Sequence, residues 1–268
     1  EPVAWVPGED LGTGADVSLP AARVQYPPPD DAPGPAITTG LGLGNSGVEA
    51  LLAGLYEVIE RDATMLSWYS TYDPVRLRVD DDGFRGLVGR ARAEGLSVTA
   101  LLVTVDVDVP VVAVAVHRGG EGDGSSDEAA GAEWPRFAAG SAASLDGAAA
   151  ARSALAEALQ NWMELRAMGR ERAAAEEGAV ARYAAFPAEA RRFVEPPGAP
   201  VPVAAVGPDP VPSGEAELSA LVDRVTDAGL DAYAARVTPP DVERLGFEAV
   251  RVLVPAAQPL FTGEPFFG

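Results

Sequence analysis

Apolar residues recur at helical spacing over two long stretches of the chain. Between residues 45 and 68, leucine, valine, isoleucine and methionine return every three or four positions, which predicts a long buried helix. Ser46, followed three positions later by Glu49, forms a capping-box pattern that marks the start of this helix. The same spacing predicts a second long helix over residues 148–168.

Shorter apolar runs predict strands around these helices. Residues 97–108 and 109–116 are expected to form adjacent strands of one sheet, and residues 75–79 alternate like a further strand. The last part of the chain is predicted to form a helix over 215–228, a strand over 231–237, a short helical turn to Gly246 and a strand over 247–254. These elements indicate an α+β fold, with mixed or antiparallel sheets packed with long helices.

Prolines and glycines mark the breaks between elements. Residues 3–6 are predicted to form a short strand that ends in a turn at residues 7–10, Pro-Gly-Glu-Asp. Residues 119–132, rich in Gly, Ser, Asp and Glu, predict a solvated acidic loop. Residues 195–213 predict a proline-rich linker within a single domain that spans residues 1–268.

One face of the first helix is acidic rather than apolar. Positions 49, 53, 57, 60 and 64 share this face and carry Glu, Ala, Glu, Glu and Thr. Glu57 and Glu60 are one turn apart, where like charges repel by roughly 0.2–0.5 kcal/mol, and Arg61 offsets only part of this. Burial of unpaired carboxylates costs much more. A hard divalent cation bound through the carboxylate oxygens removes the conflict.

The second helix and the approach to the first also carry polar or glycine-rich patterns. Glu157, Gln160, Asn161 and Glu164 form a polar stripe, of which Glu164 is expected to face solvent. Residues 38–45 hold glycine at every second position from 40 to 44. This run resembles a phosphate cradle at a helix N-terminus, where backbone N–H groups can approach an anion. The other interpretation is that the glycines only allow close packing of the chain.

Composition excludes several kinds of chemistry. The chain contains no cysteine, and all 20 basic residues are arginine. A thiolate nucleophile, a zinc–sulfur site, a Schiff-base lysine and a P-loop lysine are therefore excluded. The single histidine, His117, ends an apolar run and is expected to be a strand-end residue rather than a catalytic one. Acid–base and metal chemistry must rest mostly on Asp and Glu.

The charge and hydropathy of the chain limit the kinds of partner that it can bind and the places in the cell where we expect it. A net charge of −20 argues against nucleic-acid binding, because no basic surface is available to neutralise phosphates. An acidic chain in which arginine replaces lysine suggests a salt-loving source. No run of ~18 apolar residues is present, so we expect no membrane association and a cytoplasmic protein.

Two motifs at the first helix resemble those of a known family. Residues 44–50, Gly-Asn-Ser-x-x-Glu-Ala, and residues 54–62, Gly-Leu-x-Glu-Val-Ile-Glu-Arg-Asp, resemble the signature of the YcaO family. Residues 154–160 resemble the family's second helix, and residues 238–246 and 250–255 resemble its late segment. The matches follow the family's order over most of the chain.

The resemblance implies an ATP- and Mg²⁺-dependent enzyme that acts on peptide backbones. Members of the family phosphorylate an amide oxygen; a nucleophile then adds at the amide carbon and phosphate leaves. A neighbouring Cys, Ser or Thr side chain gives an azoline, whereas an external sulfide donor gives a thioamide. The resemblance therefore implies a peptide or protein substrate, and it leaves room for a sulfur-delivery partner protein and for a homodimer.

The resemblance also assigns residues to the nucleotide site. It implies that Glu49, Glu57, Glu60 and Glu157 are metal ligands, and that Asn45, Arg61 and Gln160 assist in binding the nucleotide. It assigns no catalytic residue. Asp62 is expected to cap or pair within its helix rather than to contact ATP. An arginine that the family often places one turn before Glu157 is replaced by Ser153, with Arg152 offset by one position.

Departures from the family pattern suggest an incomplete chain. It begins at Glu1 without a methionine, and no counterpart of the family's further nucleotide-binding helix precedes residue 38. We therefore expect that an N-terminal portion is missing and that the fragment could be inactive. The chain ends without the proline-rich tail of azoline-forming members, which favours a thioamide product. The alternatives are a non-catalytic peptide- or partner-binding module and an acidic α/β domain whose carboxylates pair with arginine.

Overall fold

The computed structural model describes residues 4–29, 37–118, 134–176, 184–186 and 188–260. The chain forms two compact units, which are described separately below. Unit 1 comprises Glu1–Leu66, Thr104–Val109 and Pro208–Leu260, and unit 2 comprises Ser67–Val103, Pro110–Gly207 and Phe261–Gly268. The acidic loop predicted over residues 119–132 lies outside the described residues.

Unit 1 contains an antiparallel sheet with the strand order β2-β1-β9-β10-β3. Its strands are β1 (Trp5–Asp10), β2 (Asp16–Pro20), β3 (Leu41–Gly44), β9 (Tyr233–Arg236) and β10 (Glu248–Leu253). The helices are α1 (Ala21–Val24), α2 (Gly47–Tyr69, of which the last three residues belong to unit 2), α7 (Glu215–Asp227) and α8 (Pro240–Arg244). The N-terminal strands thus share one sheet with the last strands of the chain.

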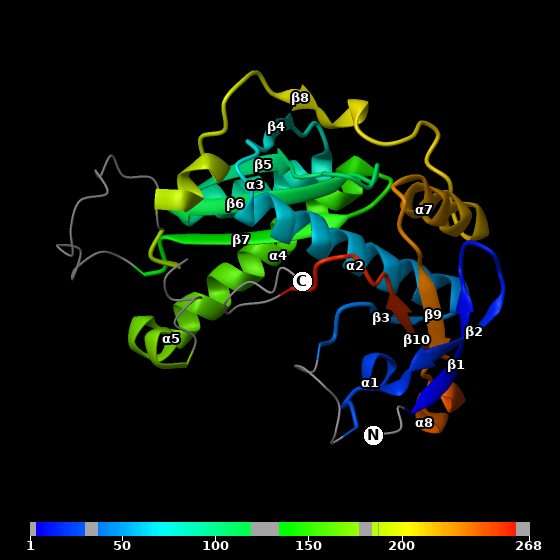
Figure 1. Cartoon of the computed structure of the whole chain (residues 1–268). Coiled ribbons are helices and arrows are strands. Elements are labelled where there is room, and N and C mark those ends of the chain that lie inside the picture. The colour runs from blue at the N-terminus through cyan, green and yellow to red at the C-terminus, as the bar shows by residue number, and fades with distance from the viewer. Residues whose placement is uncertain (1–3, 30–36, 119–133, 177–183, 187, 261–268) are drawn as a thin grey trace. The chain divides into compact units, whose positions relative to one another are not determined.

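Unit 2 contains a second sheet with the order β7-β6-β5-β4-β8, antiparallel except for the parallel pair β4–β8. Its strands are β4 (Val75–Arg78), β5 (Leu96–Leu102), β6 (Val111–Arg118), β7 (Phe137–Ala143) and β8 (Val201–Pro202). The helices are α3 (Asp82–Ala93), α4 (Gly147–Met168), α5 (Arg170–Glu176) and the short 3₁₀ turns η1 (Ala188–Phe193) and η2 (Val203–Ala205). Helices α3 and α4 contact each other and this sheet (Figure 1). Apolar side chains of the two helices and of the strands form the core of the unit.

The structure confirms the predicted fold class and both long helices. Residues 7–10, predicted to form a turn, are the last four residues of β1 and pair with β2 and β9. The strand predicted over residues 97–108 ends at Leu102, and residues 104–109 belong to unit 1. A Cβ at Gly8 would lie 2.5 Å from Leu19 Cδ1 on β2, so only glycine fits this strand position without a shift of its neighbour. Residues 195–213 include β8, which pairs with β4, so part of this proline-rich segment belongs to a sheet. The assignment of a single domain with an internal linker stays a prediction.

The ends of α2 are held by specific hydrogen bonds. Ser46 Oγ accepts the N–H of Glu49 at 3.2 Å, which is the expected N-cap bond. The Glu49 carboxylate reaches back one residue further than in a standard capping box, to the backbone N–H of Asn45 at 2.8 Å. At the other end, the Arg192 guanidinium donates to the carbonyl oxygens of Ser67 and Trp68. A distant cation therefore satisfies the last turn of α2.

Glycines bring α2 very close to the sheet of unit 1. A Cβ at Gly42 would overlap the carbonyl oxygen of Ala50, and one at Gly44 would lie 2.5 Å from Glu49 Cβ. A Cβ at Gly40, whose φ is +87°, would overlap the carbonyl oxygen of Val252 on β10. Close packing thus accounts for all three glycines. The phosphate-cradle interpretation stays a prediction.

This packing predicts the effect of adding one methyl group. Gly42→Ala should lower the free energy of unfolding by about 1–3 kcal/mol, because the new Cβ forces the strand away from the helix. Gly86→Ala on α3 is a matched control, since nothing lies within 4 Å of its added Cβ; it should stabilise by up to about 1 kcal/mol. Urea denaturation followed by circular dichroism measures both changes. Equal stability of the two variants would contradict the prediction.

Candidate functional site

Glu57 lies at the middle of the acidic face of α2 and is fixed by two partners. Its Oε2 accepts the backbone N–H of Gly40 at 2.7 Å, and its Oε1 lies 2.7 Å from an Nη of Arg61. Arg61 in turn donates to Thr39 Oγ1 at 2.9 Å. The side chains of Glu57 and Arg61 remain 27% and 24% exposed. The carboxylate is therefore oriented by its surroundings and still accessible from solvent.

A buried arginine adds positive charge near Glu57. Arg251 on β10 is only 1% exposed, and it donates to the carbonyl oxygens of Arg23 at 3.0 Å and Ile37 at 2.8 Å. Burial lowers the pKa of Arg251, while the negative charge of Glu57 opposes that shift. Sequence reasoning assigned Arg251 no role. A charged residue between Val250 and Val252 of an apolar strand was the available signal.

Asn45 and Glu49 come together at the N-terminus of α2. Both the side-chain N–H of Asn45, at 2.9 Å, and its backbone N–H reach one carboxylate oxygen of Glu49. These hydrogen bonds, the side-chain bond first, lower the pKa of Glu49. Glu60 lies half-buried one turn after Glu57 on the same helix. The structure thus assigns capping contacts to Glu49, and its role as a metal ligand stays a prediction.

In unit 2, the polar stripe of α4 is bonded to strand β7. Glu157 Oε2 accepts the backbone N–H of Ser141 at 2.8 Å, and Asn161 Nδ2 donates to the carbonyl oxygen of Ala139 at 2.8 Å. Gly140, between these two strand residues, makes the approach possible, since a Cβ there would lie 2.6 Å from the carbonyl oxygen of Ala154. Glu157 is thereby positioned by the neighbouring strand.

Gln160 and Arg152 of this helix also have side-chain partners. Gln160 is exposed and donates to Glu164 Oε1 at 2.9 Å on the same helix. Arg152 pairs with Asp81 Oδ2 at 2.7 Å, and Asp81 also caps α3 by accepting the N–H of Phe84. Arg152 therefore has a structural partner on α3. The roles of Glu157 and Gln160 towards a nucleotide stay predictions.

The same local arrangement occurs once in each unit. A glycine-containing strand packs against a long helix, and a glutamate of the helix accepts a backbone N–H at that strand. Glu57 bonds to Gly40, which directly precedes β3 in unit 1, and Glu157 bonds to Ser141 of β7 in unit 2. In each case the bond orients a carboxylate on the helix surface. Two glutamates that the sequence singled out are therefore preorganised in the same way.

The donor set fits Mg²⁺ held jointly by protein and phosphates better than a cage built by protein alone. Among the described residues, no three His, Asp or Glu side chains are grouped so that they could hold a metal ion. Mg²⁺ commonly takes only one or two protein carboxylates, and phosphates and water supply its other ligands. Glu57 and Glu60 offer two carboxylates on one helix face, and the Arg61 guanidinium beside them suits a phosphate.

Asp62 has a different role from the one its position suggested. It does not cap or pair within α2: its Oδ1 accepts the backbone N–H of Gln258, which follows β10, at 2.6 Å. The residue is only 5% exposed. Burial raises the pKa of Asp62 to about 6; the bond from Gln258 opposes this shift, and the charge of Asp106 adds to it. Asp62 thus ties the segment after β10 to the helix.

His117 lies at the penultimate position of β6, and its ring stacks on Phe186 with centroids 5.6 Å apart. Burial lowers the pKa of His117. The ring is therefore packed against an aromatic neighbour at the end of the strand, and a catalytic role is not needed to explain it.

Comparison with known proteins identifies the family of the chain. A family model described as YcaO cyclodehydratase, ATP- and Mg²⁺-binding, matches residues 1–258. The chain belongs to the YcaO family. The expected cofactors, ATP and Mg²⁺, are those that the family's description gives.

Two solved structures and one sequence relative show the extent of the similarity. The structure of YcaO from Methanopyrus kandleri, bound with AMPPCP and Mg²⁺, has a TM-score of 0.73 and 29% identity, covering 96% of this chain and 65% of that one. A heterocyclase in complex with substrate and cofactor has a TM-score of 0.78 and 23% identity, covering 98% of this chain and 34% of that one.

The sequence relative is an uncharacterised protein from Methanothermobacter thermautotrophicus. It is 35% identical over an alignment of 107 residues that covers 37% of this chain and 28% of that protein. The chain therefore spans only part of the length of each of these proteins. Its fold is that of the YcaO family.

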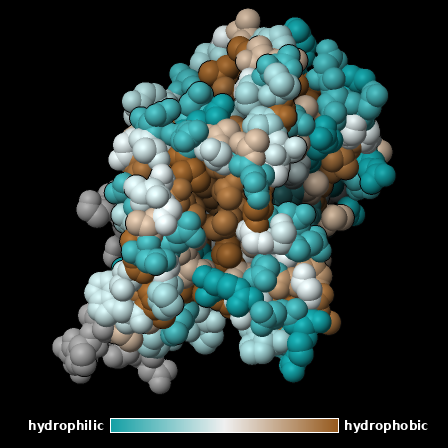
Figure 2. Space-filling view, turned by 90° about the vertical axis from the view of Figure 1, so that its right-hand side faces the viewer, coloured by the Kyte–Doolittle hydropathy of each residue, from teal (hydrophilic) through white to brown (hydrophobic). Residues whose placement is uncertain are grey.

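The surface of the chain carries both hydrophilic and hydrophobic side chains. Hydrophilic side chains cover much of the face shown in Figure 2, with hydrophobic ones between them. Large apolar residues that are exposed include Trp5, Leu43 and Leu245. Within the ranges that the structure describes, every helix is too short or too polar to cross a membrane.

The burial of Asp62 predicts a pH dependence of stability. Its folded-state pKa of about 6 exceeds the ordinary value of 3.8, so its contribution is fully present below 3.8 and is lost as the pH rises through about 6. Asp62→Asn lacks this titration. From about pH 4 to about pH 7, the free energy of unfolding of the variant should therefore rise relative to that of the native chain.

Denaturation curves at several pH values measure this difference. Asp223→Asn is the matched control, because it removes the same charge at an exposed position on α7. A constant difference between Asp62→Asn and the native chain across the range would show that Asp62 does not titrate as its burial indicates.

Proposed function

We propose that this chain binds ATP and Mg²⁺ and activates a backbone amide of a peptide by phosphorylation of the amide oxygen. Membership of an ATP- and Mg²⁺-binding family supports this, as does the similarity to a structure bound with AMPPCP and Mg²⁺. The observation that carries the proposal is the oriented carboxylate of Glu57, held by Gly40 and Arg61 on the acidic face of α2.

The proposed roles follow from the contacts of each residue. Glu57 and Glu60 hold Mg²⁺ on the nucleotide phosphates, and Arg61 contacts a phosphate oxygen while it keeps Glu57 in place. Further ligands in the proposal are Glu49, Glu157, Asn45 and Gln160. Bound ATP supplies the phosphoryl group, and Mg²⁺ neutralises charge on the phosphates. Phosphoryl transfer needs mainly positioning and charge neutralisation, so a chain without cysteine or lysine can perform it.

Preorganisation is the protein's main contribution in this proposal. The Gly40 N–H and the Arg61 guanidinium hold the Glu57 carboxylate in one orientation before any ligand binds. The guanidinium groups of Arg61 and Arg251 bring positive charge to this part of a chain whose net charge is −20. Groups fixed in advance lose little freedom on binding an anion, which favours binding of a polyphosphate.

The product depends on the nucleophile that adds at the activated amide carbon. A neighbouring Cys, Ser or Thr side chain gives an azoline, and a sulfide donor brought by a partner protein gives a thioamide. In both cases the amide oxygen leaves as part of phosphate and the terminal phosphoryl group of ATP is consumed. We include both products in the proposal, with a peptide or protein as substrate and a homodimer as one form of assembly.

A second candidate is a non-catalytic YcaO-like module that binds a peptide or a partner protein. One observation favours it: both carboxylate oxygens of Glu57 already have partners within the chain, so the acidic face can be stable without a metal. In that case the stripe of α2 is a structural network. Nucleotide binding distinguishes the two candidates.

Isothermal titration calorimetry tests the nucleotide site directly. Mg²⁺-ATP should bind the native chain, and Glu57→Gln and Glu60→Gln should each weaken it by at least about tenfold, because each removes a charged ligand. Glu215→Gln, an exposed glutamate at the start of α7, loses the same charge away from the stripe and should bind like the native chain. Binding that survives both changes on α2 would defeat the proposed metal ligands.

Mass spectrometry of a peptide incubated with the chain and Mg²⁺-ATP tests the reaction. A peptide that contains cysteine should lose one water per azoline formed, and the same peptide with sulfide should instead exchange amide oxygen for sulfur. Label placed in the amide oxygen should appear in the released phosphate. Nucleotide binding with no change of any peptide and no phosphate release would favour the non-catalytic module.

A further inference from the structure

Strand β5 in unit 2 has an open edge. It pairs with β6 along its whole length, from Leu96 to Leu102. On its other side only Leu101 and Leu102 are paired, with β4, which then pairs with β8 instead. Within the described ranges, residues 96–100 therefore have a strand partner on one side only. Such an edge offers backbone N–H and C=O groups to an extended peptide.

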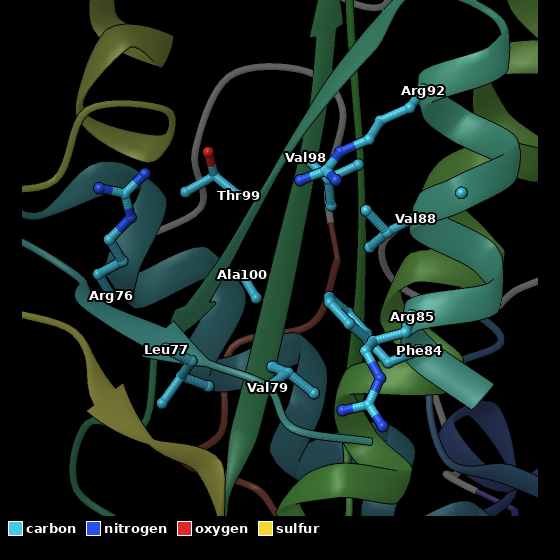
Figure 3. A pocket seen from close by; sticks show the side chains of 11 residues that line it. Arg76, Leu77, Val79, Phe84, Arg85, Val88, Arg92, Val98, Thr99 and Ala100 are labelled. Atoms are coloured by element: carbon cyan, nitrogen blue, oxygen red, sulfur yellow. The ribbon is translucent and has the colours of Figure 1, made fainter. Parts of the chain in front are cut away.

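A pocket of about 530 Å³ lies at this edge, between α3, β4 and β5 (Figure 3). Its apolar lining includes Leu77 from β4, Phe84 and Val88 from α3, and Val98 and Ala100 from β5. The volume is within the range of ligand sites. Leu77, Phe84 and Ala100 are themselves buried, so the apolar residues that a ligand can contact beside the unpaired side of the strand are Val79, Val88 and Val98.

Three arginines surround this apolar lining. Arg76 comes from β4, and Arg85 and Arg92 come from α3, with Arg92 extending towards Val98 (Figure 3). Arg85 pairs with Asp80 and Asp82. Arg76 and Arg92 are exposed and make no ion pair within the part of the chain that the structure describes. In a chain with a net charge of −20, two uncompensated guanidinium groups at one pocket suit a carboxylate ligand.

We propose that this pocket binds an extended acidic segment of a peptide, which adds as a strand to the open edge of β5. Side chains of an extended peptide alternate in direction, so those on one side face α3 and Arg92, and those on the other side face Arg76. Acidic residues on both sides of the peptide can therefore pair with these two arginines. The open edge favours a peptide over a small anion, which would leave the strand unpaired. The segment belongs to the substrate, and to that extent the inference rests on the proposed function.

Fluorescence anisotropy tests this pocket on the 268-residue chain with a labelled, end-capped peptide of glutamate and valine that carries glutamate at both odd and even positions. The peptide should bind, and binding should weaken as salt is added. The same peptide with glutamine in place of glutamate should bind several-fold more weakly. Equal binding of the two peptides, or binding of neither, would overturn the proposal.

Charge-matched variants locate the site. Arg76→Gln and Arg92→Gln should each weaken binding of the acidic peptide by about two- to fivefold, as expected for exposed ion pairs. Arg78→Gln on the same strand and Arg90→Gln on the same helix remove the same charge outside the pocket and should leave the dissociation constant unchanged. Equal losses in all four variants would show a general effect of charge and contradict the assigned groove.

Two further arms test strand addition itself. A peptide N-methylated at alternate residues should lose most of its affinity, because it cannot complete the ladder of backbone hydrogen bonds. Undiminished binding of the N-methylated peptide would show a small-anion site instead. Displacement of the unmodified peptide by inorganic phosphate at the same concentration as the peptide would show the same.

Calorimetry with Mg²⁺-ATP on the same preparation separates this inference from the proposed function. If the chain binds the nucleotide but not the acidic peptide, the peptide site at β5 is contradicted and the proposed function is not. Peptide binding to the pocket without nucleotide binding supports the groove as a peptide site and defeats the proposed activation chemistry.

Discussion

The close contact between β3 and α2 determines how the acidic face of the helix is arranged. Glycine at positions 42 and 44 lets strand and helix backbones approach to a distance at which a Cβ would clash. Just before β3, the backbone N–H of Gly40 reaches the Glu57 carboxylate. With bulkier residues the helix would stand further away, and Glu57 would lose one of the two groups that orient it. Packing and preorganisation thus have the same origin.

Unit 2 has the same arrangement of a glycine, a long helix and a glutamate bonded to the main chain. Gly140 of β7 allows α4 to approach, and Glu157 accepts the N–H of Ser141. A backbone donor has no side-chain torsions of its own, so it holds a carboxylate in place at little cost in entropy. The polar stripes of the two helices resemble the nucleotide-binding motifs of the YcaO family. Main-chain groups support a glutamate of each stripe, from the turn before β3 in unit 1 and from β7 in unit 2.

Arginine has several distinct roles in this acidic chain. Arg61 pairs with Glu57, Arg152 holds the residue that caps α3, and Arg192 satisfies carbonyl groups at the end of α2. Arg251 is buried and donates to two backbone carbonyls, and among the described residues one of its side-chain nitrogens has no partner. These cations organise helix ends and carboxylates. Arg76 and Arg92 are exposed and form no ion pair with the residues that the structure describes, and this distinguishes the pocket beside β5.

The sequence by itself determined the two long helices, most strands, the α+β class and the residues of the acidic stripe, because periodicity, caps and a specific motif are local features. Only the tertiary structure decided what depends on distant partners. Residues 7–10 form a strand because β2 and β9 pair with them, Asp62 bonds to Gln258 rather than within its helix, and Arg251 is buried beside Glu57. These contacts join residues far apart in the chain, and no local pattern encodes them.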